Sequence, residues 1–145
     1  AHLPLTSAMA VTVRRADPSG VELAIPLEPN LNHEGTAFGG SISTGGILAG
    51  WGLLWVRTQR LPQPPRLVIA HSSTRYIRPV GGDFKVVCHA PNDKLCRQFE
   101  ETLAATGKAR LALRSELTCD GKIAAVHDGV YVALRADPPA GKAGA

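Results

Sequence analysis

This 145-residue sequence has few of the residues that build cysteine frameworks, metal centres or dinucleotide sites. Its three cysteines, Cys88, Cys96 and Cys119, share no Cys-x-x-Cys spacing, so neither a disulfide framework nor a zinc knuckle is indicated. Its five histidines include no i, i+4 pair and no His-Glu-x-x-His motif. The glycine pairs at 39–40 and 45–46 do not form Gly-x-Gly-x-x-Gly after a strand. We therefore expect no metal and no cofactor.

Charge and aromatic content narrow the class of partner. The formal net charge is +4 and the isoelectric point is about 9.3, which favours acidic partners such as phosphorylated cofactors or acidic carrier proteins. The basic residues are scattered, with only Arg14 and Arg15 adjacent, and the two Trp, two Tyr and three Phe do not interleave with them. We therefore expect no nucleic-acid partner.

The segment 38–56 contains no charged residue and is as long as a transmembrane helix. Nearly half of it is glycine, serine or threonine, so it would gain little by entering a bilayer. We expect instead a helix wrapped by the rest of the protein, whose glycines allow close contact with a curved sheet.

The first residues lack the basic and apolar regions of a secretory signal. Together with the cysteine usage, this predicts a cytoplasmic protein with no membrane span.

The flanking segments alternate apolar and polar residues with the period of strands. Asp120-Gly121 is a strong signal for a two-residue hairpin turn, and Asn92 or Asp93 begins a short amphipathic helix that ends at Gly107. The order is two strands, the long helix, then four strands with the short helix among them. This order predicts an α+β fold in which a curled antiparallel sheet of about six strands wraps around one central helix. The expected strands cover residues 9–14, 21–27, 67–79, 83–90, 109–117 and 122–134. Residues 1–136 form one domain in this interpretation, and residues 137–145 form a flexible tail.

The stretch from Asn32 to Ser41, Asn-His-Glu-Gly-Thr-Ala-Phe-Gly-Gly-Ser, places two glycines where a loop enters the apolar helix. The first backbone N–H groups of a helix have no intrahelical partner, and glycine lets a ligand approach them closely. Such a site can hold the oxyanion of acyl transfer or hydrolysis. A tight turn before a buried helix explains the same glycines.

The pattern Asn-x-x-Gly-x-x-Phe-Gly-Gly over residues 32–40 resembles the Asn-x-x-Gly-x-x-His-Gly-Gly motif of the hotdog-fold thioesterases. Residues 35–41, Gly-Thr-Ala-Phe-Gly-Gly-Ser, are similar to the branch known as the YiiD C-terminal thioesterase domain. Segments at 76–80, 107–111 and 129–132 also look like that branch, so the resemblance spans roughly residues 8–134.

The resemblance implies a homodimer, or a dimer of dimers, that hydrolyses an acyl-CoA or acyl-carrier-protein thioester at the subunit interface. In such a site the N–H of Gly40, aided by Gly39, holds the thioester carbonyl oxygen. Asn32 orients the carbonyl or the attacking water, although an Asx turn of the loop explains this residue as well.

Two positions depart from the pattern of the resembled enzymes. Phe38 replaces the motif histidine, and Ile47 stands where many relatives place an acidic residue. Catalysis must therefore recruit another group. The candidates within the motif are His33, Glu34 and Ser41, and those on the third expected strand are His71, Ser72 and Ser73. The expected substrate-binding residues are Thr36, Phe38, His71, Ser73, Tyr76 and Arg78.

Each candidate has a structural alternative. His33 and Glu34 fit a solvated loop, Ser41 fits a helix-start hydroxyl, and the polar residues around His71 fit a solvated strand face. His127-Asp128 resembles a hydrogen-bonded pair, but no nucleophile lies near it in sequence, which argues against a triad. A domain that binds acyl thioesters or lipids without catalysis, or that serves for dimerisation, is the alternative function.

Overall fold

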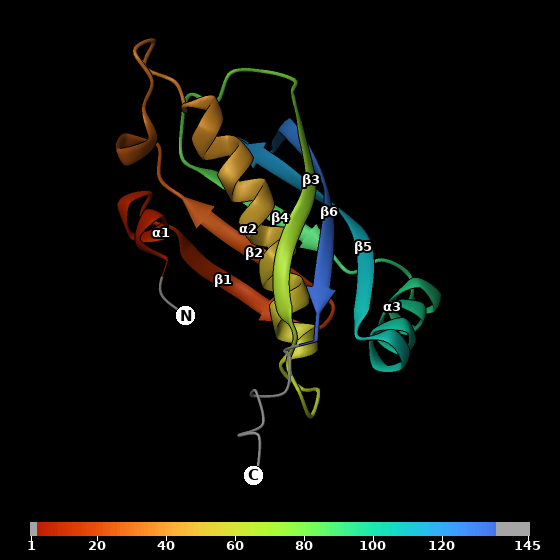
Figure 1. Cartoon of the computed structure of the whole chain (residues 1–145). Helices are drawn as coiled ribbons and strands as arrows, with labels where there is room; N and C mark the ends of the chain where they lie inside the picture. Colours follow the sequence, from red (N-terminus) through yellow and green to blue (C-terminus); the bar gives the residue numbers. More distant parts are fainter. Residues whose placement is uncertain (1–2, 136–145) are drawn as a thin grey trace.

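Six antiparallel strands form one sheet in the computed structural model, which describes residues 3–135. Their spatial order is β1-β2-β4-β5-β6-β3, so β1 and β3 are the edge strands (Figure 1). The predicted tail at 137–145 lies outside the described residues. The elements are α1 (Pro4–Ala8), β1 (Thr12–Asp17), β2 (Gly20–Ile25), a 3-10 turn (Glu28–Asn30), α2 (Gly39–Thr58), β3 (Arg66–Tyr76), β4 (Phe84–His89), α3 (Asp93–Thr106), β5 (Lys108–Cys119) and β6 (Lys122–Leu134).

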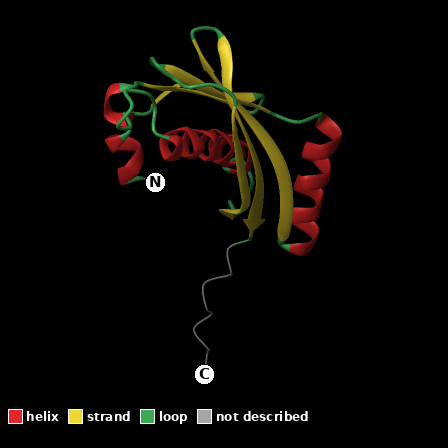
Figure 2. Ribbon diagram, turned by 90° about the horizontal axis from the view of Figure 1, so that it is seen from above, coloured by secondary structure: helices red, strands yellow, loops and turns green. Residues whose placement is uncertain are grey.

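The sheet curves around α2, and α3 lies beside β5 (Figure 2). This is the hotdog fold, so the predicted fold class and the predicted order of the long elements are confirmed. The sequence analysis did not predict α1, whose five residues are too few to show a helical period. Asn92 accepts a hydrogen bond from the N–H of Leu95 at 2.9 Å, and Gly107 ends α3 with φ +78°, as predicted.

The glycines of α2 allow the helix to lie directly on the sheet. A Cβ on Gly46 would overlap the Cβ and ring of His127, and one on Gly50 would overlap the ring of Tyr131. Tyr131 is fully buried, and its hydroxyl donates to the carbonyl of Ile47 at 2.9 Å. Side chains larger than hydrogen at these positions would push α2 away from β6, so close contact with the sheet explains the glycines.

The loop between β3 and β4 joins strands that are not neighbours. β3 pairs only with β6, whereas β4 lies between β2 and β5, so residues 77–83 cross the molecule instead of forming a hairpin. On the way, Val80 accepts a hydrogen bond from the N–H of Ala37 at 2.8 Å. This crossing brings the end of β3 against the loop that precedes α2.

A bulge divides β3 into two halves. Ile69 pairs with Tyr131 and His71 with Val130, so Ala70 is an extra residue in the ladder. Side chains alternate faces along a strand, and one extra residue reverses the alternation. Leu67 and Ile69 pack against the core before the bulge, and the residues that face α2 after it are Ser72, Thr74 and Tyr76.

Candidate functional site

The loop 32–37 is held together by the side chain of Asn32. Its Oδ1 accepts from the N–H groups of Glu34 at 2.8 Å and Thr36 at 3.1 Å. Its Nδ2 donates to Thr36 Oγ1 at 2.8 Å and to the Ala37 carbonyl at 3.4 Å. Both ends of the amide therefore shape the loop that leads into α2. Gly35, at φ +78°, supplies the left-handed residue that this loop needs.

The start of α2 presents two backbone donors. Phe38 precedes the helix in extended conformation and its side chain makes no capping hydrogen bond. The N–H groups of Ser41 and Ile42 both donate to the Phe38 carbonyl, at 3.0 and 3.2 Å. Among residues 3–135, no acceptor is found for the N–H of Gly39 or Gly40. An anionic oxygen placed here would meet two donors at the positive end of the helix dipole.

A cleft of about 390 Å³ opens beside this helix start. It brings together Thr36, Gly39, Tyr76 and Arg78, which the sequence places up to forty-two positions apart. The Tyr76 hydroxyl donates to the Gly39 carbonyl at 2.8 Å, and Arg78 Nε donates to the Ile123 carbonyl at 3.1 Å. The apolar part of the lining comes from Ala37, Ile42, Ile77, Pro79 and Val80.

Other candidate residues lie outside the cleft. His33 Nε2 and Glu34 Oε1 are 3.1 Å apart at the exposed tip of the loop, with side chains 89% and 73% exposed. Ser41 is half-buried on α2. The Phe38 ring is 57% exposed and lies over Gly40, where a Cβ would collide with it.

His71 and Ser73 lie on the opposite face of β3 from Tyr76, because the bulge at Ala70 sets the alternation. His71 lines a shallow cavity on the outer face together with Arg114 and Asp128. The structure therefore does not bring His71 and Ser73 to the start of α2.

A polar strip joins β3 to α2 and β6, and the sequence does not predict that its members meet. It consists of Tyr76, Thr74, Ser43, Ser72 and His127. Thr74 Oγ1 donates to Ser43 Oγ at 3.0 Å, and Ser72 Oγ lies 2.8 Å from His127 Nε2. Ser72 and His127 are fifty-five positions apart, and only the antiparallel pairing of β3 with β6 brings them together.

His127 and Asp128 do not form the pair that their adjacency suggested. Asp128 points to the outer face, where Arg114 donates to its two carboxylate oxygens at 2.8 and 3.2 Å and lowers its pKa. His127 is 3% exposed, and its Nδ1 has no partner within the described chain. Burial lowers the pKa of the His127 imidazole, with a smaller opposing effect from the charge of Asp128.

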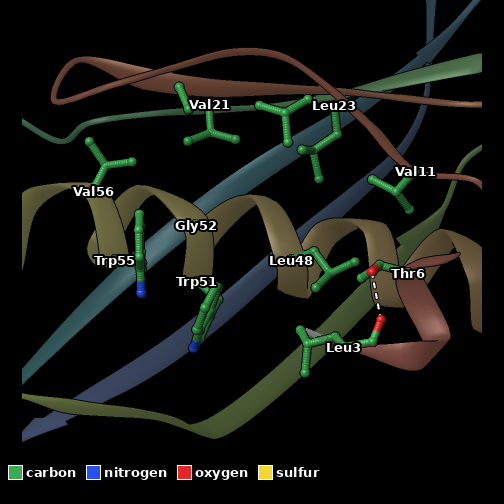
Figure 3. A pocket seen from close by; sticks show the side chains of 12 residues that line it. Leu3, Thr6, Val11, Val21, Leu23, Leu48, Trp51, Gly52, Trp55 and Val56 are labelled. Carbon is green, nitrogen blue, oxygen red and sulfur yellow. Dashed lines mark hydrogen bonds between the residues drawn. The ribbon is translucent and has the colours of Figure 1, made fainter. Parts of the chain in front are cut away.

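An apolar groove of about 310 Å³ lies on the other side of α2, between that helix, α1 and the β1–β2 hairpin (Figure 3). Its lining is almost entirely apolar, and Trp51 and Trp55 stack with ring centroids 6.5 Å apart. The residues along it are Leu3, Thr6, Val11, Val13, Ala16, Val21, Leu23, Leu48, Trp51, Gly52, Trp55 and Val56.

Residues 3–135 contain no group of three or more His, Cys, Asp or Glu side chains arranged to hold a metal ion. None of the helices described there has the length and hydropathy to cross a membrane. All three cysteines are buried free thiols, and burial raises the pKa of Cys88 to about 11.

The curled sheet and the open helix start together define a hotdog domain of the thioesterase class. The family described as "Putative thioesterase (yiiD_Cterm)" matches residues 1–135, so the chain belongs to that family. The predicted family is thereby confirmed. Family membership supports a thioester hydrolase activity and leaves the substrate unspecified.

Solved structures agree with this family. A protein of unknown function from Chlorobaculum tepidum is 30% identical, with a TM-score of 0.89, and the match covers 93% of this chain and 88% of that one. A "putative thioesterase" from Shewanella oneidensis is 32% identical, with a TM-score of 0.80 and coverage of 91% and 89%. A "Probable Thioesterase" from Pseudomonas aeruginosa, 23% identical, has a TM-score of 0.82 and coverage of 92% and 89%, which shows the shared fold.

Proposed function

We propose that this protein hydrolyses an acyl-CoA or acyl-carrier-protein thioester in the cleft at the start of α2. The observation that carries the proposal is the pair of free N–H groups at Gly39, which lines the cleft with Thr36, Tyr76 and Arg78, and at the next residue, Gly40. The carbonyl oxygen of the thioester lies against these donors and gains negative charge as water attacks. Preorganised donors of this kind stabilise the transition state more than the substrate.

Asn32 acts in this proposal by shaping the loop. Its amide fixes the positions of Thr36 and Ala37, and through them the first turn of α2. The Oδ1 and Nδ2 atoms of Asn32 already have hydrogen-bond partners within the loop. Shaping the loop is therefore its main role in this proposal, and a contact with the substrate carbonyl or the attacking water is secondary. Arg78, exposed at the rim of the cleft, is the cation best placed for a phosphate of the carrier group.

We also propose a homodimer formed along the free edge of β3. This strand is eleven residues long and pairs with β6 on one side only. Val68, Tyr76 and Ile77 are 47%, 53% and 48% exposed on and beside it, and Phe38 adds an exposed ring nearby. A long edge with apolar side chains is normally covered, and pairing with a second copy would cover it.

The apolar groove is the part of the chain best suited to the acyl group. Its volume of about 310 Å³ and its apolar lining match a hydrocarbon ligand. It begins at Leu48, eight residues and therefore about 12 Å of helix beyond Gly40. In this proposal the thioester lies at the helix start and the end of a medium or long acyl chain lies in the groove.

A thiol-release assay over a series of acyl-CoA and acyl-carrier thioesters tests the activity. Gly40→Pro removes one N–H while keeping a backbone angle that suits the first turn of a helix, and Gly40→Ala keeps the N–H as the matched control. We expect Gly40→Pro to lower kcat by about 10²–10³, the usual effect of deleting an oxyanion donor. Equal turnover by both variants would remove this N–H from the mechanism.

A second candidate is a domain that binds acyl thioesters without hydrolysing them. Ile47 favours it, because an apolar side chain stands where the resembled enzymes carry an acid. Thermal stabilisation by the same thioesters without thiol release would establish this alternative.

We also propose a cytoplasmic location, which the three free cysteines support.

A further inference from the structure

We propose that Ser72 is a nucleophile activated by His127, forming a second reactive centre separate from the cleft at the start of α2. The geometry is that of a serine and its base: Ser72 Oγ lies 2.8 Å from His127 Nε2. Ser72 is exposed to solvent, whereas His127 is 3% exposed. The hydroxyl is therefore accessible to a reagent while the base is shielded from water.

The imidazole is held in place by the backbone around it. A Cβ on Gly46 would overlap the Cβ and Cγ of His127, and one on Gly129 would lie 3.0 Å from its Cε1. Two glycines, one on α2 and one on β6, thus leave room for this ring and restrict its movement. Burial keeps the imidazole neutral at pH 7, which is the form that accepts a proton.

The orphan Nδ1 of His127 distinguishes this pair from an ordinary cross-strand hydrogen bond. A buried polar atom without a partner costs free energy and calls for an explanation. With the proton on Nδ1, Nε2 accepts the Ser72 O–H, and the ring carries the tautomer that a general base requires. We assign this tautomer to the pair. Asp128 does not serve as the third member, because it faces Arg114 on the other side of the sheet.

A donor for the developing oxyanion lies next along the polar strip. Thr74 is two residues beyond Ser72 and therefore on the same face of β3. Its hydroxyl donates to Ser43 Oγ at 3.0 Å. The Ser43 hydroxyl keeps its own proton and is free to donate. The two reactive regions use different groups: the first uses backbone N–H groups of Gly39 and Gly40, whereas none of Ser43, Ser72 and His127 lines the cleft beside them.

The substrate class is an acyl ester or acyl thioester. Ser72 Oγ bonds to the acyl carbon while its proton moves to His127 Nε2. The carbon–sulfur or carbon–oxygen bond then breaks, and the leaving thiolate or alkoxide takes the proton from Nε2. Water attacks the acyl-Ser72 ester, His127 accepts a proton from it, and this proton returns to Ser72 Oγ as the free acid leaves.

Covalent labelling of the full-length protein tests the proposal. A fluorophosphonate, which forms a bond from serine oxygen to phosphorus and releases fluoride, and p-nitrophenyl butyrate are each followed by intact mass and peptide mapping. We expect the label on Ser72, its loss in Ser72→Ala, and its retention in Ser73→Ala, the neighbouring serine on the opposite face. A label that persists in Ser72→Ala, or that Ser73→Ala removes, would overturn the proposal.

His127→Gln is expected to slow labelling of Ser72 by about 10²-fold or more, the typical contribution of a general base. Since this variant can also disturb the buried site, the labelling rate of the wild-type protein is measured over pH as well. It should rise as the imidazole loses its proton at a pH below the ordinary 6.5, and a rate that stays flat down to the lowest pH at which the protein remains folded would contradict the role of His127. Labelling does not depend on thioester turnover, so it separates this inference from the proposed hydrolysis at Gly39 and Gly40.

Discussion

The two sides of α2 are built from different chemistry. Toward the second half of β3, α2 makes polar contacts, Tyr76 to Gly39 and Thr74 to Ser43, and the Ser72–His127 pair lies next to Gly46. Toward β1 and β2, the helix presents Leu48, Trp51, Gly52, Trp55 and Val56 to an apolar groove. On one side of α2, hydrogen bonds therefore fix the positions of side chains. On the other side, packing depends only on the shape and area of apolar surfaces.

This difference shows how a helix with little charge supports a site. Apolar contacts are non-directional and tolerate small shifts, whereas each hydroxyl on the polar strip needs a partner at a defined distance and angle. The polar side is consequently the one whose geometry the fold must hold. Its cleft of about 390 Å³ suits a polar group, whereas the apolar groove of about 310 Å³ suits a hydrocarbon chain.

The largest expected effect is on stability. Gly46→Ala places a methyl group into His127, so the free energy of unfolding should fall by about 2–3 kcal/mol. Gly52→Ala is the matched control in the same helix, because its Cβ would meet Val21 at 3.8 Å, an ordinary contact. That variant should be more stable by about 0.5–1 kcal/mol through helix propensity. Urea unfolding measures the free energy of unfolding of both variants. An equal change in the two would mean that α2 does not lie closer to the sheet at Gly46 than at Gly52.

The next effect is on association. Val68→Lys puts a charge on the free edge of β3 and should weaken the proposed dimer at least about tenfold, or about 1.4 kcal/mol. Val13→Lys makes the same change on β1, the other edge, where Val13 is 60% exposed. Sedimentation equilibrium compares the two. Dissociation by Val13→Lys alone would place the dimer contact on β1.

A smaller effect concerns the length of the acyl chain. Gly52→Leu fills part of the groove and should raise KM for long-chain thioesters about fivefold relative to short-chain ones, close to 1 kcal/mol. Gly52→Ala, which adds little volume, is the control. The thiol-release series provides the readout, and an unchanged chain-length profile would exclude the groove as the acyl site.

The smallest effect is the dependence of stability on pH. Burial places the pKa of His127 below its ordinary 6.5, so the unfolded chain takes up this proton at higher pH than the folded one. The free energy of unfolding should therefore fall as pH decreases from about 6.5 to the lower folded pKa, and should be unaffected by this group above that window. His127→Gln should remove this slope in thermal melts. A slope that survives the substitution would assign it to another group.

The sequence predicted the fold well because its signals are local. Alternation along the strands, Asp120-Gly121 at the last turn and the cap at Asn92 each depend on neighbouring residues. The family followed from the motif at 32–41. The five residues of α1 are too short for such a signal, and the pairing of β3 with β6 instead of β4 is a property of the whole sheet.

The candidate site was less predictable, for two physical reasons. An asparagine at position 32 fits a ligand-binding amide and an Asx turn equally well. The three-dimensional structure reveals that its side-chain atoms form hydrogen bonds within the loop. The polar residues of β3 divide between two faces, and the alternation seen from Leu67 onward predicts the wrong face after Ala70. Ser72 was therefore not recognised as a partner of His127.

Ala70 gives β3 two tasks within one strand. Before it, the inward residues are aliphatic and help to close the core; after it, the inward residues carry the hydroxyl groups. If β3 paired with β6 without this bulge, with Ala70 taking a place in the ladder, His71, Ser73 and Arg75 would face α2 and Ser72, Thr74 and Tyr76 would turn outward. The bulge thus decides which of two complete sets of side chains faces the helix, with no arrangement in which half of the set is retained.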